Sequence, residues 1–202
     1  MDALLQPAWT LVGTPFTWLE LLAFLLSIAM VLANMRQWLV GWPLAAASSL
    51  LYGLLFFHGQ LYGEAALQLF FVAMAIWGFL QWWQGRAQST LTVRRMAPTA
   101  WAWSLGSIAV GAPLLGWVLD HYTDSPLPYW DAVPTVASVV ATVQLGRKYL
   151  ENWGFWVAVN AVSVILFSLR AYWLTVLLYA AFIPLSVLGW RAWARAPRMP
   201  RP

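Results

Sequence analysis

The stretch TWLELLAFLLSIAMVLANM, residues Thr17–Met35, decides the class of fold, because Glu20 near its start is its only charged residue. A helix needs about 20 mainly apolar residues to cross the hydrocarbon core of a bilayer, with roughly 17 as the lower end. Six further stretches are nearly free of charge: Trp38–Phe57, Tyr62–Trp83, Ala100–Leu119, Ala132–Leu145, Trp153–Leu169 and Tyr172–Trp190. Ala132–Leu145 is short, and we expect it to extend outward over Tyr129 and Trp130.

The composition agrees with a membrane protein. The chain is 62% hydrophobic and 9% charged, and its mean hydropathy is +0.68. Soluble domains carry about 25% charged residues. Only helices and closed barrels satisfy the backbone inside lipid, and runs this long and apolar favour helices. The sequence therefore predicts an all-α integral membrane protein with seven transmembrane helices.

The basic residues predict the orientation of these helices. Ten of the eleven Lys and Arg residues fall in alternate loops, on one side of the predicted membrane: Arg36, Arg86, Arg94, Arg95, Arg147, Lys148, Arg191, Arg195, Arg198 and Arg201. The other side holds Arg170 alone. By the positive-inside rule, we expect the N-terminus outside and the C-terminus in the cytoplasm of a multi-pass inner-membrane protein. Loops that face anionic lipid explain the pI of 9.8 without a nucleic-acid partner.

The two ends of the chain and the missing residue types add further expectations. Residues Met1–Gln6 lack a positive n-region, so we expect no cleavable signal, and residues 195–202 read as a cytoplasmic tail. The chain has no Cys, and therefore no disulfide framework. We expect no metal and no cofactor, because no cluster has metal-ligand spacing.

The chain also resembles itself at a spacing of 111 residues. This shift aligns residues 20–83 with residues 131–194 without a gap, and 11 of the 64 pairs are identical. Helix ends and basic loops coincide as well. We therefore predict one membrane domain with two three-helix repeats (residues 17–83 and 131–194) joined by a linker helix (residues 100–119). An odd number of helices per repeat makes the repeats parallel, in a 3+1+3, SWEET-like layout with a binding site between them.

Polar and aromatic side chains form stripes at helical spacing on the predicted second, third, sixth and seventh helices. In the sixth helix Trp153, Trp156, Asn160 and Ser163 share one face. Lipid-facing surfaces favour Leu, Val and Ile, so we expect these stripes to face inward. The candidate substrate-binding residues are Trp156, Asn160, Gln68, Trp153, Ser163, Ser49, Ser48, Tyr52, Tyr179 and Trp77.

A structural role competes with binding at each of these positions. Asn and Ser often join membrane helices, and Trp near a helix end is usually an interfacial anchor. We interpret Trp38, Trp82, Trp83, Trp190 and Trp193 as anchors. Asn160 and Gln68 differ from these, because each lies a turn or more inside an apolar span, where an unmet amide costs several kcal/mol.

The middles of the predicted spans hold no Asp, Glu, Lys, Arg or His. Ion- and proton-coupled carriers usually place such groups there, so the pattern favours uncoupled, facilitated diffusion. No nucleophile motif or acid–base pair is present, which argues against an enzyme. Walls of Trp, Tyr and Phe with a few amides suit a flat heteroaromatic, neutral or cationic, because cation–π attraction reaches about 2 kcal/mol when desolvated.

The second half of the chain resembles the PnuC-type vitamin transporters in Tyr129-Trp130-Asp131, in the run from Arg147 to Trp153, and in Trp156-x-x-x-Asn160-x-x-Ser163. The first half is similar in Phe56-Phe57-x-x-Gln60-Leu61-Tyr62, Leu67-Gln68-x-Phe70-Phe71 and Trp77-Gly78. The resemblance implies a 3+1+3 homotrimer that takes up nicotinamide riboside by facilitated diffusion. It also implies that Trp156 and Asn160 bind the substrate and that a cytoplasmic kinase traps it as its phosphate.

Two departures from the family pattern lie in the expected pocket. Ser48 or Ser49 stands where relatives often have Asn, and Trp77-Gly78-Phe79 replaces a Tyr-Gly-Trp pattern. Relatives of this type carry thiamine, riboflavin or deoxynucleosides, so a transporter for thiamine or another vitamin or nucleoside remains the alternative. A seven-helix receptor that does not transport is a lesser alternative.

Overall fold

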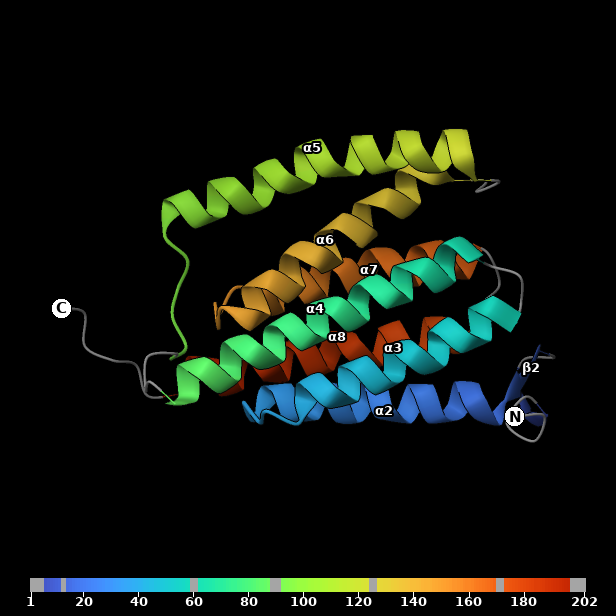
Figure 1. Ribbon diagram of the computed structural model, residues 1–202, viewed down its shortest axis with the longest axis horizontal. Coiled ribbons are helices and arrows are strands. Elements are labelled where there is room, and N and C mark those ends of the chain that lie inside the picture. Colours follow the sequence, from blue (N-terminus) through green and yellow to red (C-terminus); the bar gives the residue numbers. More distant parts are fainter. Residues whose placement is uncertain are drawn as a thin grey trace.

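The computed structural model describes residues 6–11, 14–58, 62–87, 92–123, 127–169 and 173–196, and these residues hold seven helices and one short hairpin (Figure 1). The helices are α2 (Trp18–Met35), α3 (Gly41–His58), α4 (Tyr62–Ala87), α5 (Pro98–Tyr122), α6 (Pro128–Gly146), α7 (Asn152–Leu169) and α8 (Trp173–Ala194). The prediction of seven helices is confirmed. The short span also extends over Tyr129 and Trp130 as predicted, because α6 begins at Pro128.

Local chemistry sets several of these boundaries. Thr17 caps α2: its hydroxyl accepts the Glu20 N–H at 3.2 Å, and the Glu20 carboxylate accepts the Thr17 N–H at 2.7 Å. This reciprocal pair is a capping box. Pro98 and Pro128 open α5 and α6, where a missing N–H costs nothing. The one charged residue of this apolar stretch, Glu20, thus caps the start of α2.

The antiparallel hairpin of β1 (Pro7–Leu11) and β2 (Thr14–Thr17) precedes α2 and was not predicted. It stands at the end of the bundle where α2 begins (Figure 1). Its strands are too short for their alternation to be recognised in the sequence.

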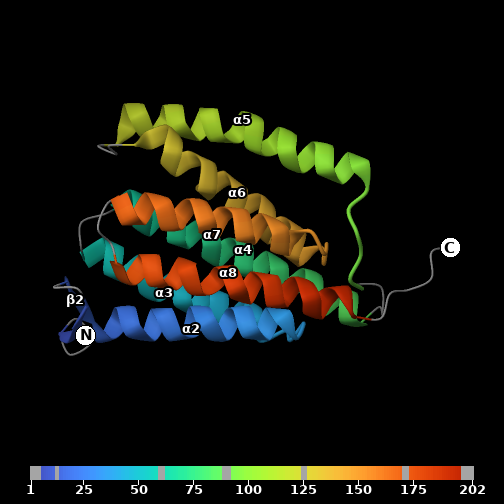
Figure 2. The same ribbon diagram turned by 180° about the vertical axis from the view of Figure 1, so that it is seen from behind.

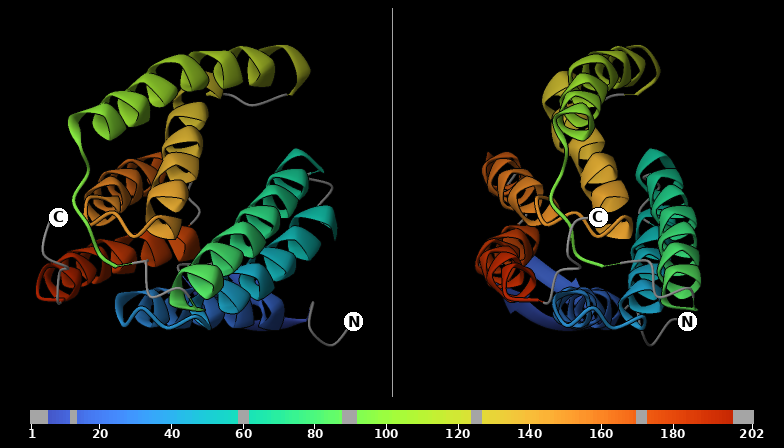
Figure 3. Two further views of the ribbon diagram at one scale, coloured as in Figure 1. Left: turned by 60° about the vertical axis from the view of Figure 1, so that its left-hand side comes forward. Right: turned by 90° about the vertical axis from the view of Figure 1, so that its left-hand side faces the viewer.

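The helices lie side by side along the long axis of the molecule (Figures 1 and 2). Within the first half α2 packs on α3 and α3 on α4, and within the second half α6 packs on α7 and α7 on α8. The halves meet twice, where α4 packs on α6 and where α2 packs on α8. Seen from the end, these six helices form a ring, and α5 lies outside it against α6 (Figure 3).

The loops that carry the basic residues lie at one end of the bundle, together with the ends of α4 and α8 (Figure 1). Arg36, Arg94, Arg147 and Arg195 belong to this basic end. The exception, Arg170, lies outside the described residues, as do Arg198 and Arg201. Of the helices in the described ranges, α2, α5, α7 and α8 are long and apolar enough to cross a membrane by length and composition.

The two turns at the basic end follow the same backbone path. Gln37, between α2 and α3, has φ 56°, and Lys148, between α6 and α7, has φ 55°. Their N–H groups donate to Asn34 and Leu145, respectively, at 3.0 Å in both cases. Each of these residues lies 111 positions from its counterpart.

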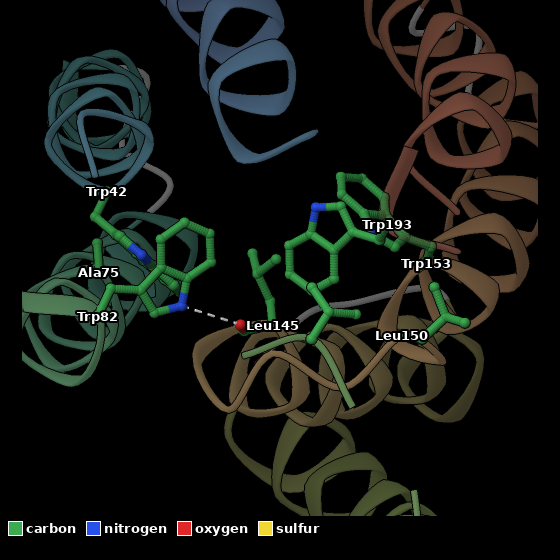
Figure 4. Close-up of a cluster of buried hydrophobic side chains, with 8 residues drawn as sticks. Trp42, Ala75, Trp82, Leu145, Leu150, Trp153 and Trp193 are labelled. Carbon is green, nitrogen blue, oxygen red and sulfur yellow. Dashed lines mark hydrogen bonds between the residues drawn. The ribbon is translucent and has the colours of Figure 1, made fainter. Parts of the chain in front are cut away.

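A cluster of buried tryptophans fills the basic end of the ring (Figure 4). Trp42 meets Trp82 edge-on at 5.5 Å, and Trp153 meets Trp193 in the same way at 5.5 Å. The Trp82 and Trp193 rings are 6.1 Å apart, so positions related by 111 residues touch each other between the halves.

Both of these central indoles donate hydrogen bonds across the interface between the halves. Trp82 Nε1 donates to the carbonyl of Leu145 at 3.2 Å, and Trp193 Nε1 donates to the carbonyl of Asn34 at 3.0 Å. The interpretation of Trp82 and Trp193 as interfacial anchors is therefore wrong, because they are 3% and 0% exposed. Trp38 and Trp83 are more than half exposed, as an anchor requires.

Candidate functional site

Asn160 lies near the middle of α7 and is 1% exposed. Its amide Nδ2 donates to Ser186 Oγ of α8 at 3.4 Å. Its Oδ1 has no hydrogen-bond partner among the described residues. Buried polar atoms are nearly always paired, so each exception requires an explanation. Ser186 fixes the Asn160 amide, and the unpaired buried Oδ1 is a candidate acceptor for a hydrogen bond from a ligand.

Two other predicted residues continue the Asn160 face of α7. Ser163 lies three positions further along and is 3% exposed, and Trp156 lies one turn earlier and is half-buried. Residues three or four apart share a helix face, so the three side chains form one row from the indole to the hydroxyl.

Aromatic rings surround the outer part of α7 and α8. Tyr179 of α8 stacks on Phe167 with centroids 5.4 Å apart and meets Phe182 edge-on at 6.3 Å. Tyr52 of α3 stacks on Phe56 at 6.1 Å. Tyr52 and Tyr179, predicted from opposite halves, thus each belong to an aromatic pair within their own half.

The two neighbouring serines of α3, Ser48 and Ser49, differ in burial. Ser48 is buried, 2.6 Å from Ser27 Oγ, and donates to the Ala23 carbonyl at 3.0 Å, so it joins α3 to α2. Ser49 is half-buried.

Gln68 of α4 is also half-buried and packs over Gly53 of α3. A Cβ at Gly53 would lie 3.3 Å from the Gln68 Cβ. The glycine therefore allows the two helices to approach closely at this level.

Trp153 and Trp77 lie apart from Asn160. Trp153 belongs to the tryptophan cluster at the basic end, where it packs against Gly189 (Figure 4). Trp77 of α4 packs against Gly146 at the end of α6, which is a contact between the halves. Packing accounts for both indoles. Helical spacing in the sequence could not show that Trp153 and Trp77 are packing residues rather than binding residues.

Sequence reasoning did not include Ser186 among the binding candidates, although it shares its stripe on α8 with Tyr179. Only the structure shows that it holds the Asn160 amide. Reasoning also missed Gln144 of α6, which donates to Ser104 of α5 at 3.0 Å and fixes the linker helix. The sequence did indicate a structural role for Gln144, because an amide near the end of an apolar span needs a hydrogen-bond partner.

Two cavities in the described part of the structure lie away from the Asn160 row. One of about 590 Å³ runs along the outer side of α5 and is lined by Thr99, Ala102, Trp103, Gly106, Ser107 and Val110. Another of about 170 Å³ lies at the basic end. As far as the described residues go, no group of three His, Asp or Glu side chains could hold a metal ion.

Comparison with known proteins gives a consistent family. A family model described as "Nicotinamide mononucleotide transporter" matches residues 17–195. The nicotinamide riboside transporter PnuC of Escherichia coli strain K12 is 30% identical over 174 residues, which cover 73% of this chain and 73% of that protein. The riboflavin/roseoflavin transporter RibM of Streptomyces davaonensis is 27% identical over 208 residues and covers 100% of this chain and 97% of its own length.

The fold agrees with the same family. The crystal structure of the vitamin B3 transporter PnuC superposes with a TM-score of 0.73 and 26% sequence identity, over 88% of this chain and 81% of that one. The match of the family model spans nearly all of the described helices. The chain is therefore a membrane transporter and belongs to the PnuC-type vitamin transporter family.

Proposed function

We propose that this protein carries nicotinamide riboside across the bacterial inner membrane by facilitated diffusion, without catalysis. The observation that carries this proposal is the buried Asn160 amide, whose Oδ1 has no partner in the described part of the chain. A carboxamide or ribose hydroxyl is a donor that fits such an oxygen. The names of the Escherichia coli and Neisseria mucosa relatives, the latter 27% identical over 200 residues, support this substrate.

The aromatic residues near Asn160 fit the flat part of this substrate. Trp156, Tyr52 and Tyr179 are half-buried, so each keeps some ring surface for a ligand. A cationic nicotinamide ring gains about 2 kcal/mol from an aromatic face once water is removed. Ser163, Ser49 and Gln68 are the further polar candidates, and Ser48, Trp153 and Trp77 complete the predicted set.

The mechanism proposed is uncoupled. The charged groups of the described helices lie near their ends, as Glu20 of α2, Asp131 of α6 and Arg191 of α8 do. A proton- or sodium-driven carrier needs titratable or ion-binding groups within the spans. Net uptake then requires removal of the substrate inside the cell, and phosphorylation by a cytoplasmic kinase is the step expected to supply it.

The proposed architecture is two parallel three-helix repeats joined by the linker helix α5, which lies outside their ring. Its support is the set of matched contacts 111 residues apart, such as Trp82 to Leu145 and Trp193 to Asn34. We place the basic end in the cytoplasm and the hairpin outside, by the positive-inside rule. All seven helices then cross the membrane, and the exposed apolar face of α5, with Val110 and Leu114 more than 60% exposed, is available for a homotrimer.

Riboflavin is the second candidate substrate, because the RibM match covers nearly the full length of both proteins. Isothermal titration of the purified protein with nicotinamide riboside, riboflavin and thiamine decides between them. We expect micromolar or tighter binding of the riboside and about tenfold or greater weakening by Asn160→Ala, which removes a buried hydrogen-bond acceptor. Ser104→Ala, a buried polar change on α5, is the matched control.

Tight binding of riboflavin or thiamine, with no binding of nicotinamide riboside, would contradict the proposed substrate. The protein would still be a vitamin transporter. Binding of no vitamin would favour a receptor that does not transport. Uptake into liposomes that follows an imposed proton or sodium gradient would contradict the uncoupled mechanism.

A further inference from the structure

The cavity of about 170 Å³ at the basic end lies between the two halves of the molecule. It is lined by Gln37 and Leu39 from the α2–α3 turn, Trp82 and Arg86 from α4, and Lys148 from the α6–α7 turn. Sites for whole small molecules usually measure about 300–1,000 Å³. This cavity therefore suits a single small group rather than the transported substrate.

Two cations meet in this cavity without a carboxylate partner. Lys148 Nζ lies 4.8 Å from the Trp82 ring centroid and donates to Gln37 Oε1 at 3.1 Å, and Arg86 lines the same cavity. Across the described ranges, neither Arg86 nor Lys148 forms a salt bridge. Glu151, the acid closest to Lys148 in the sequence, already accepts the Met96 N–H at 2.9 Å.

Lys148 and Arg86 have N–H groups that can donate hydrogen bonds to an anion in the cavity. An ammonium carries three N–H groups, and Gln37 accepts one of those of Lys148. Arg86 is exposed and adds a planar guanidinium, which binds phosphate through two parallel hydrogen bonds. The positions 111 residues from Lys148 and Arg86 are Gln37 and Pro197, so this pair of charges occurs once in the chain.

We propose that this cavity binds a phosphate group, held by the Lys148 ammonium and the Arg86 guanidinium. Like charges that line one cavity repel, and an anion between them removes that repulsion. Because Arg86 belongs to α4 and Lys148 to the α6–α7 turn, a bound phosphate ties the two halves together beside the tryptophan cluster. A phosphate in place therefore holds this end closed and slows transport.

The phosphate has two possible sources, a soluble phosphomonoester and a phospholipid headgroup. Purified protein in detergent is titrated with inorganic phosphate and with adenosine monophosphate at constant ionic strength, with chloride as the reference anion. The same protein in nanodiscs of phosphatidylcholine with and without phosphatidic acid tests the headgroup. Thermal unfolding and Trp fluorescence report binding, because Trp82 lines the cavity.

We expect a saturable rise in melting temperature with a soluble phosphate or with phosphatidic acid. Lys148→Gln and Arg86→Gln should each weaken binding about tenfold or more, since each removes a charge-assisted contact. Gln at 148 suits the backbone, because Gln37 adopts the same positive φ. The control is Arg191→Gln, an exposed basic residue of α8 outside the cavity, which should bind as the wild type does.

Two results would overturn the proposal: no response to any phosphate probe beyond that of chloride, or equal losses in Lys148→Gln and Arg191→Gln. Titration with nicotinamide riboside on the same samples separates this test from that of the proposed function, because the riboside site lies at Asn160 and is expected to survive Lys148→Gln.

Discussion

Gly189 leaves no room for a side chain beside the tryptophan cluster. A Cβ there would lie 2.6 Å from three atoms of the Trp153 indole, which is held edge-on against Trp193. We expect Gly189→Ala to lower stability by about 1–3 kcal/mol through overpacking. Thermal unfolding in detergent measures this loss. Gly106→Ala is the control, because its Cβ meets nothing within 4 Å; an equal loss there would contradict the packing argument.

Lys148 gives stability a pH dependence whose sign follows from its surroundings. Burial, and then the charge of Arg86, lower the pKa of Lys148 below its ordinary value of 10.5. The unfolded chain therefore binds this proton more tightly than the folded one, and stability rises as pH increases from the folded-state pKa toward 10.5. Below that window the penalty on the charged form is complete.

The measurement for Lys148 is the difference in melting temperature between the wild type and Lys148→Gln in phosphate-free buffers of increasing alkaline pH. The wild type should gain on the variant as pH approaches 10.5, because only the wild type loses the penalty of a buried charge. A difference that stays constant across this range would show that the ammonium is not destabilised in the folded state.

At the scale of elements, the segment before α5 is tied to the turn between α6 and α7. Arg94 N–H donates to the Lys148 carbonyl at 3.1 Å, and the Leu150 N–H donates to the Arg94 carbonyl at 2.9 Å. The buried Glu151 carboxylate accepts the Met96 N–H. We expect Glu151→Ala to cost about 1–3 kcal/mol, since it leaves that N–H unpaired.

Trypsin offers a local readout of this docking, because Arg94 and Arg95 are exposed cleavage positions in the segment. Glu151→Ala should speed cleavage there, whereas Asp120→Asn, an exposed change at the opposite end, should not. Unchanged cleavage in Glu151→Ala would mean that the backbone bridge alone holds the segment.

The elements were predictable because the bilayer fixes the length of an apolar helix, so the ends of α2, α3 and α7 fall within three residues of the predicted spans. Side-chain roles were less predictable. Near the end of a helix, a Trp has the same sequence context whether its side chain is exposed, as that of Trp83 is, or buried in the core, as that of Trp82 is. The partnership of Asn160 with Ser186 depends on how α7 meets α8, which spacing along one helix does not specify.

At the scale of the whole molecule, two matched hydrogen bonds close the basic end: Trp82 to the Leu145 carbonyl and Trp193 to the Asn34 carbonyl. Each joins one half to the other. In the proposed architecture, alternating access requires the two halves to separate at this end, and these bonds then favour the closed state. Replacing either indole by Phe removes one bond of about 0.5–1.5 kcal/mol and shifts the population toward opening by about twofold to tenfold.

Because the chain has no Cys, a single Ala45→Cys reporter reads this opening without background. Ala45 of α3 is half-buried against the tryptophan cluster, so a thiol there should react faster when the end opens. We expect labelling by a maleimide to accelerate in Trp82→Phe and Trp193→Phe to a similar extent, since the two bonds are equivalent. Trp83→Phe, the same change at an exposed neighbour, should label as the parent does. If Trp82→Phe and Trp193→Phe label no faster than Trp83→Phe, the two indole bonds do not control opening, and the tryptophan cluster is static packing.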